Sequence, residues 1–211
     1  EYTGLLQGKN RILVTAEAVA AEVIDPERTP TLYRLATQGI QFRDYYQPAW
    51  GASTTTGDFS NLVGLVPTTA GMCMKEATQQ DLFLTMGHQL QAQNYYSAAY
   101  HNHNKDFYDR DKTHTHLGYD RFLARYGGLE GITGVFPESD LEMIDVTVPQ
   151  YIDHQPFSVY YMTVSGHCMY SQKENAMARK NYDVVAGMDH CEAVKCYYAS
   201  QQELEYAMES L

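Results

Sequence analysis

The strongest strand signal in the chain constrains the fold most. Residues 157–164 read FSVYYMTV, a run of apolar, aromatic and β-branched side chains. Such residues are enriched in β-strands, and the run predicts a strand here. It is followed at once by Ser165, Gly166 and His167, so the predicted strand ends at polar residues. Any fold of this chain therefore has to be built around a sheet that contains this segment.

Other segments alternate between strand and helix patterns. Further strands are predicted at residues 11–16, 40–46 and 95–100. Helical spacing or start signals predict helices at residues 29–39, 54–64, 79–92, 139–149 and 189–211. Thr29 is expected to cap the first of these helices, with Pro30 at its first position. This alternation predicts an α/β fold with a mostly parallel central sheet flanked by helices.

Polar residues follow three of the predicted strands, at the point where each strand ends. In an open α/β sheet the site lies outside the carboxyl ends of the strands. Glu17 follows the first strand, His101 and His103 follow the strand at 95–100, and His167 follows the strand at 157–164. We therefore expect these four side chains to converge on one site.

A long polar stretch follows the strand at 95–100. Residues 101–122 are rich in histidine and charge, and we expect them to form a functional loop. His114 and His116, which belong to no recognised block, are interpreted as ordinary loop residues.

Residues 50–67 read WGASTTTGDFSNLVGLVP and hold three consecutive threonines. Small hydroxylated residues between a glycine and a helix-like segment suit a nucleophile at a helix N-terminus, where unpaired N–H groups favour an anion. The alternative for the motif alone is an ordinary Ser/Thr-rich loop with an N-cap.

Composition excludes some classes of protein. The 211 residues are 44% hydrophobic and 19% charged, which is typical of a globular chain. A net charge of −11 argues against a nucleic-acid partner. The most apolar run, at 11–24, carries Glu17 and Glu22 and is too short and too polar to span a membrane. Because the chain begins with Glu1, we expect it to be part of a longer polypeptide.

Six segments match one family in order. They are KNRILVTAEAV at 9–19, TPTLYRLATQGIQFRDYYQ at 29–47, WGASTTTGDF at 50–59, AYHNHNKDFYDRD at 99–111, LGYDRF at 117–122 and PFSVYYMTVSGHCMY at 156–170. Together they resemble the extracellular catalytic domain of lipoteichoic acid synthases and related phosphoglycerol transferases. This family belongs to the alkaline phosphatase/sulfatase superfamily, so the resemblance implies an alkaline phosphatase/sulfatase-like fold.

The resemblance assigns roles around the threonine cluster. Glu17 falls where the family has a metal-ligating glutamate, the alternative being an acid that caps a helix. Thr54 occupies the position of the nucleophile and metal ligand, with Thr55 as the alternative register. In the same register, Asp58 falls where the family has an acidic residue before an aromatic one.

The resemblance also assigns substrate-binding residues. Arg110 falls where the family grips the substrate phosphate, a task that suits a planar guanidinium. Tyr108 stands where a tryptophan is more usual. His167 resembles a substrate-contacting histidine, and His101 and His103, in the same block as Arg110, are expected to contact substrate or to be solvated loop residues.

The implied activity is a metal-dependent phosphoglycerol transfer. Thr54 would attack the headgroup of a phosphatidylglycerol-type lipid, and a polymer or glycan acceptor would displace the covalent intermediate. The expected cofactor is a divalent metal, Mn²⁺ first, with Mg²⁺ or Zn²⁺ as alternatives. The parent protein is expected at the extracellular face of a bacterial membrane, anchored by a segment absent from this chain. We expect a monomer.

One family feature is missing from the sequence. The family's metal site also needs an Asp-His pair on a later strand, and Asp189 and His190 precede the last helix and are not interpreted as that pair. We therefore expect residues 1–211 to be the N-terminal larger part of a single domain, truncated before its final metal-ligand block and inactive as a fragment. Two rivals remain: a phosphate or sulfate ester hydrolase, and a non-catalytic phosphate-binding domain. No Cys/Ser-x-Pro-x-Arg motif occurs around 51–60, which counts against a sulfatase.

Overall fold

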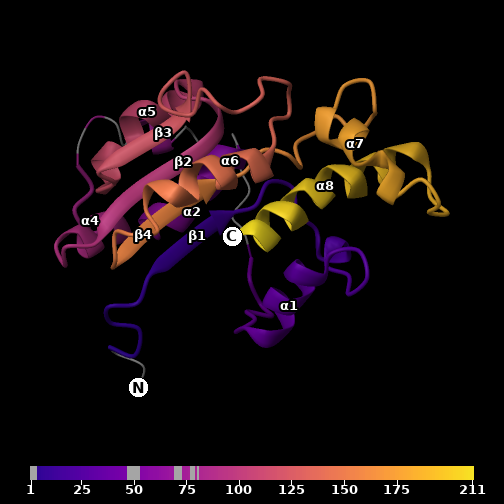
Figure 1. The fold of residues 1–211 in the computed structure, drawn as a ribbon. Coiled ribbons are helices and arrows are strands. Elements are labelled where there is room, and N and C mark those ends of the chain that lie inside the picture. The colour runs from indigo at the N-terminus through magenta and orange to yellow at the C-terminus, as the bar shows by residue number, and fades with distance from the viewer. Residues whose placement is uncertain (1–3, 47–52, 69–72, 77–78, 80) are drawn as a thin grey trace.

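A four-stranded parallel sheet forms the centre of the protein (Figure 1). The computed structural model describes residues 4–46, 53–68, 73–76, 79 and 81–211. The strands lie in the order β1-β4-β2-β3. Their bounds are Arg11–Thr15 for β1, Tyr96–Asn104 for β2, Arg121–Arg125 for β3 and Phe157–Met162 for β4. The predicted α/β class with a parallel sheet is confirmed.

The register of the strands aligns three strand ends. Thr15 at the end of β1 pairs with Met162 at the end of β4, and His101 of β2 pairs with the same Met162. Since all the strands run in one direction, the residues that follow β1 and β4 emerge beside His101. The sheet therefore gathers the predicted site residues at one edge.

Eight α-helices are described. Their bounds are Pro30–Gln38 for α1, Ser53–Val63 for α2, Cys73–Glu76 for α3, Met86–Gln91 for α4, Arg110–Thr113 for α5, Asp140–Thr147 for α6, Ala176–Lys180 for α7 and Glu192–Ser210 for α8. Short 3-10 turns occupy Ala21–Val23, Phe107–Asp109, Thr115–Leu117, Val148–Gln150 and Tyr182–Val184. Among the helices that the structure describes, none has the length and apolarity needed to cross a membrane.

Adjacent residues of β4 pack on opposite faces of the sheet. Tyr160 packs into a core that includes Phe59 and Leu62 of α2, whereas Tyr161 packs into a core with residues of α6 and α8. Side chains alternate between faces along a strand, so a run that is apolar throughout needs both faces covered. This explains why all six residues of β4 are buried.

Three sequence expectations about segment type are wrong. Residues 40–46 form no strand, and Ile40 and Phe42 are among several large side chains there that are exposed. The alternation of apolar residues predicted a strand at 40–46, but no strand among the described residues pairs with this segment. The helix expected at 79–92 is reduced to Met86–Gln91 of α4 among the described residues. The loop expected at 101–122 contains the end of β2 and the start of β3.

The N-terminus of α1 is capped from the far end of the chain. The Thr29 side chain makes no cap hydrogen bond; its hydroxyl instead donates to the Val23 carbonyl at 2.7 Å. The Glu205 carboxylate of α8 accepts from the backbone N–H groups of Thr31 at 2.7 Å and Leu32 at 2.9 Å. A carboxylate satisfies orphan N–H groups and complements the helix dipole.

Replacing Glu205 with alanine should destabilise the fold. Glu205→Ala leaves two buried N–H groups without an acceptor, so we expect the free energy of unfolding to fall by about 2 kcal/mol. Urea denaturation measures this loss. The matched control is Glu209→Ala at the exposed end of the same helix, which should change stability by less than about 0.5 kcal/mol. Equal effects of the two variants would show that the cap contributes nothing.

Candidate functional site

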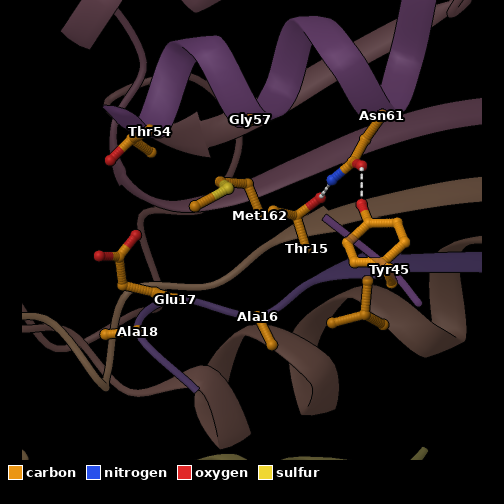
Figure 2. A pocket seen from close by; sticks show the side chains of 10 residues that line it. Thr15, Ala16, Glu17, Ala18, Tyr45, Thr54, Gly57, Asn61 and Met162 are labelled. Atoms are coloured by element: carbon orange, nitrogen blue, oxygen red, sulfur yellow. Dashed lines mark hydrogen bonds between the residues drawn. The ribbon is translucent and has the colours of Figure 1, made fainter. Parts of the chain in front are cut away.

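Two cavities meet at Glu17 and Thr54 on the carboxyl edge of the sheet. The first has a volume of about 350 Å³ and the second about 330 Å³. Both are lined by Glu17, Thr54 and Met162. Figure 2 shows the first, in which the Glu17 carboxylate and the Thr54 hydroxyl reach toward the same space from β1 and α2. The second is also lined by His101, His103, Phe107, Tyr108, Arg110, Phe136, Thr163, Val164 and His167.

The turn that carries Glu17 is held from two sides. Its backbone N–H donates to Thr163 Oγ1 at 2.8 Å, just after β4. From α8, Gln201 Nε2 donates to the carbonyls of Glu17 and Ala18, each at 3.2 Å. Ala18 has a φ of 54°, so the chain reverses through a left-handed residue directly after the carboxylate.

A glycine lets the turn after β4 approach this arrangement. A Cβ on Gly166 would lie 2.3 Å from Gln201 Nε2 and 2.6 Å from the Glu17 carbonyl oxygen. Both contacts are shorter than real side chains allow, so a residue without Cβ is required in the Ser-Gly-His segment. The glycine thus brings His167 close to the turn of Glu17.

Thr54 is the second residue of α2 and is half-buried, whereas Thr55 and Thr56 are 2% and 4% exposed. Among the three threonines, Thr54 is the one that lines both cavities. Thr54, and not Thr55, is therefore the threonine that an occupant of these cavities would meet. The residues predicted to precede the helix, 47–52, lie outside the described part of the chain.

Glu17 and Thr54 supply two oxygen donors suited to a divalent cation. Neither side chain makes a hydrogen bond to another described residue, and burial raises the pKa of Glu17 above its usual value. A half-buried carboxylate without a partner fits a cation ligand. Within the described ranges, however, no group of three His, Cys, Asp or Glu residues is placed to hold an ion. Glu17 and Thr54 could therefore supply two ligands of a cation site, and the described residues do not complete such a site. Asp189 and His190, which we do not interpret as the family's Asp-His pair, lie just before α8.

Arg110 is more enclosed than its expected role suggests. It is 1% exposed, and its Nε and Nη2 donate to Asp58 Oδ2 at 3.3 and 2.9 Å. The guanidinium carbon lies 5.3 Å from the centre of the Tyr108 ring. Arg110 nevertheless lines the second cavity, so one edge of its guanidinium is paired and another faces the site.

His101 and His103 lie within β2 instead of following it. His101 is 3% exposed, and its Nδ1 donates to the Met162 carbonyl at 2.8 Å, which leaves Nε2 as an acceptor. Burial, and next the charge of Arg110, holds the pKa of His101 well below its usual range. His103 Nδ1 lies 3.1 Å from both carboxylate oxygens of Glu138. Neither is a solvated loop residue.

Aromatic side chains form one wall of the second cavity. The ring of His103 lies 5.2 Å from Phe107 and 5.5 Å from Phe136, and Phe136 lies 5.4 Å from His167. Sequence reasoning missed both phenylalanines as site residues. Phe107 could have been found, because it stands in the quoted block beside Tyr108, whereas nothing local marks Phe136.

The backbone is strained where this wall meets Arg110. Tyr108 and Asp109 have φ values of 60° and 55°, so two consecutive residues with side chains adopt the left-handed region. Such conformations cost free energy and persist where surrounding contacts enforce them. Here they place Tyr108 under the guanidinium of Arg110.

His114 lies in a turn between α5 and Thr115–Leu117, as expected of a loop residue, but its side chain is buried in the core. It is 0% exposed and stacks on Phe122 at 4.7 Å and on Tyr160 at 5.8 Å between ring centres. Its Nδ1 lies 3.1 Å from the Arg110 carbonyl oxygen, and its Nε2 has no partner among the residues that the structure describes. Burial lowers the pKa of His114 to about 4. The other histidine interpreted as a loop residue, His116, pairs with Asp81 at 2.7 Å.

The site thus combines a threonine, a carboxylate and an arginine at the carboxyl edge of a parallel sheet in an α/β domain. The family model described as Sulfatase matches residues 9–211. This chain belongs to the sulfatase family, and the resemblance drawn from its sequence blocks is confirmed.

Named relatives share the fold over part of their length. The chain is 26% identical over 188 residues, covering 85% of itself and 30% of the relative, to the lipoteichoic acid synthase-like YvgJ of Bacillus subtilis. The lipoteichoic acid synthase LtaP of Listeria monocytogenes superposes with a TM-score of 0.79 at 22% identity, covering 100% of this chain and 52% of LtaP. The phosphoglycerol transferase GacH of Streptococcus pyogenes, in complex with sn-glycerol-1-phosphate, gives a TM-score of 0.62 at 15% identity, covering 96% and 56%.

The buried His114 should make the fold sensitive to acid. Its pKa is about 4 when folded and 6.5 in the unfolded chain, so the unfolded state holds more protons between these values. Stability is present above pH 6.5 and falls as the pH drops toward 4, by about 3 kcal/mol. Thermal and urea unfolding between pH 7 and 4 should show a shallower loss for His114→Phe, which keeps a stacking ring.

The matched control for this prediction is His190→Phe at an exposed position. It should retain the pH dependence of the unchanged chain. An equally steep acid loss in His114→Phe would show that other groups cause the effect.

Proposed function

We propose that this chain forms the nucleophile-bearing part of a metal-dependent phosphoglycerol transferase that acts on a phosphatidylglycerol-type lipid. The observation that carries the proposal is the position of Thr54 and Glu17 at the junction of two cavities, one of which contains Arg110. The chain spans 30% of the curated relative and about half of the two solved chains, so the activity of the whole protein is part of the proposal.

Thr54 is the proposed nucleophile. Its oxygen forms a bond to the phosphorus of the lipid headgroup while the bond to the diacylglycerol oxygen breaks, which gives a glycerophospho-threonine. The oxygens of Glu17 and Thr54 would hold a divalent cation, Mn²⁺ first among Mg²⁺ and Zn²⁺, with further ligands from sequence beyond Leu211. A bound divalent cation lowers the pKa of a coordinated hydroxyl and polarises a phosphoryl oxygen.

The second cavity is the proposed site of the phosphoglycerol group. Arg110 presents N–H donors to the phosphate, and His167 lines the same cavity. The lone pair on His101 Nε2 accepts a hydrogen bond from a glycerol hydroxyl, because Nδ1 carries the proton. His103, Phe107 and Tyr108 provide the wall against which the glycerol carbons lie.

A hydroxyl on a growing polymer or glycan is the proposed acceptor. It would displace Thr54 from phosphorus and complete the transfer. Because the donor is a lipid, the parent protein is proposed to work at the extracellular face of a bacterial membrane, as a monomer anchored through a segment outside this chain.

A covalent adduct on Thr54 tests the proposal. The full-length parent protein incubated with phosphatidylglycerol and Mn²⁺ should gain the mass of a glycerophosphoryl group, and Thr54→Ala should abolish the gain. Intact-mass and peptide mass spectrometry measure both. A control is Ser60→Ala, which removes another half-buried hydroxyl of α2 and should leave the adduct unchanged.

Other outcomes discriminate between the rivals. An adduct on Thr55 would contradict the register. Transfer to water instead of an acceptor would favour the ester hydrolase, and no adduct on the parent protein would favour a non-catalytic phosphate-binding domain.

A further inference from the structure

A buried ion pair links the helix of the nucleophile to the arginine of the second cavity. Asp58 is 0% exposed and lies four residues after Thr54, one turn further along the same side of α2. Arg110 comes from a segment 52 residues away, at the start of α5. The pair therefore joins two parts of the site that neither local sequence nor sheet pairing brings together.

Asp58 uses both of its oxygens. Oδ2 accepts from Nε and Nη2 of Arg110, and Oδ1 accepts from the Tyr160 hydroxyl at 2.6 Å. Burial and the Asp58 charge hold the pKa of Tyr160 well above its usual value, so the hydroxyl keeps its proton. The Tyr160 oxygen also lies 3.0 Å from Thr15 Oγ1, at the end of β1. The hydrogen bond from Tyr160 thus fixes the Asp58 carboxylate against β4, independently of its contact with Arg110.

The pairing leaves part of the guanidinium for a ligand. The Nε–Nη2 edge of Arg110 is occupied by Asp58, and Nη1 makes no hydrogen bond to any residue that the structure describes. A guanidinium carries five N–H donors in a rigid plane, so fixing one edge also fixes the direction of the others. Because Arg110 lines the second cavity, the free donors are available to an anion there.

Stability alone gives little reason for such a pair. The desolvation of two buried charges about offsets their attraction, and apolar residues of the same size often stabilise a core as well. A carboxylate on the nucleophile helix has a further use if the arginine must keep one orientation relative to Thr54.

We propose that Asp58 is a positioning residue, which holds Arg110 in its anion-binding orientation and ties that orientation to the helix that carries Thr54. The inference rests on the proposed function, in which Arg110 binds the substrate phosphate. Asp58 acts through Arg110 and touches no substrate itself. Tyr160 supports it by fixing the second carboxylate oxygen.

Affinity for sn-glycerol-1-phosphate tests the proposal directly. The probe is titrated into the 211-residue chain by NMR, with Asp58→Asn, Arg110→Gln and the double variant. We expect Asp58→Asn to weaken binding about tenfold, since the amide holds the guanidinium only weakly. The double variant should bind no worse than Arg110→Gln alone, because residues that act as one unit are not additive. A merely structural role for Asp58 predicts additive losses.

Two adjacent tyrosines give a matched pair of milder variants. Tyr160→Phe removes the hydroxyl that contacts Asp58, whereas Tyr161→Phe removes one that contacts Thr147 on the opposite face of the sheet. Both side chains are 0% exposed. We expect Tyr160→Phe to weaken binding about threefold and Tyr161→Phe to leave it unchanged. This pair decides the question if Asp58→Asn does not fold, as judged by circular dichroism.

Different results would contradict the positioning role of Asp58 and the phosphate site at Arg110. Unchanged affinity in folded Asp58→Asn, additive losses, or equal effects of the two tyrosine variants would overturn the positioning role while the proposed function stands. No binding of the probe to the unchanged chain would overturn the phosphate site itself, and the positioning role with it.

Discussion

Buried polar groups on α8 hold together segments that are far apart in the sequence. Gln201 binds the carbonyls after β1, Glu203 accepts from Asn181 after α7 at 2.9 Å, and Glu205 caps α1. A buried polar group without a partner costs free energy, so each of these side chains fixes its partner segment where it is needed. The position of Glu17 therefore depends on a helix that begins 175 residues later, at Glu192.

The helices and strands that were predicted correctly have sequence patterns that can be recognised within a short segment. The apolar runs of β1 and β4 and the helical spacing of α8 are visible in any short window, and the parallel sheet followed from their alternation. Residues 40–46 failed because alternation indicates a strand only where another strand pairs with it. β3 was hidden in a polar stretch, since it lies at the edge of the sheet, where Arg121 is exposed to solvent and Arg125 pairs with Glu138.

The site was only partly visible in the sequence. Glu17, Thr54, Arg110 and His167 were named from ordered blocks, and the structure brings all four to the lining of one cavity. Their supports were not foreseen, because Asp58 meets Arg110 across 52 residues and Gln201 meets Glu17 across 184. Such contacts follow from how helices pack on the sheet, which no local pattern encodes.

The extension of β2 to Asn104 changes what kind of pocket the second cavity is. The rings of His101 and His103 lie 6.1 Å apart, and the register of β2 against β3 shifts between His101 and Asn104. Each ring is held by its own partner, His101 by the Met162 carbonyl and His103 by the Glu138 carboxylate, so an occupant does not have to order this wall on binding. The same rigidity means that the wall adapts poorly to a bulkier group. A rigid wall of this kind selects an occupant by its shape as well as by its charge.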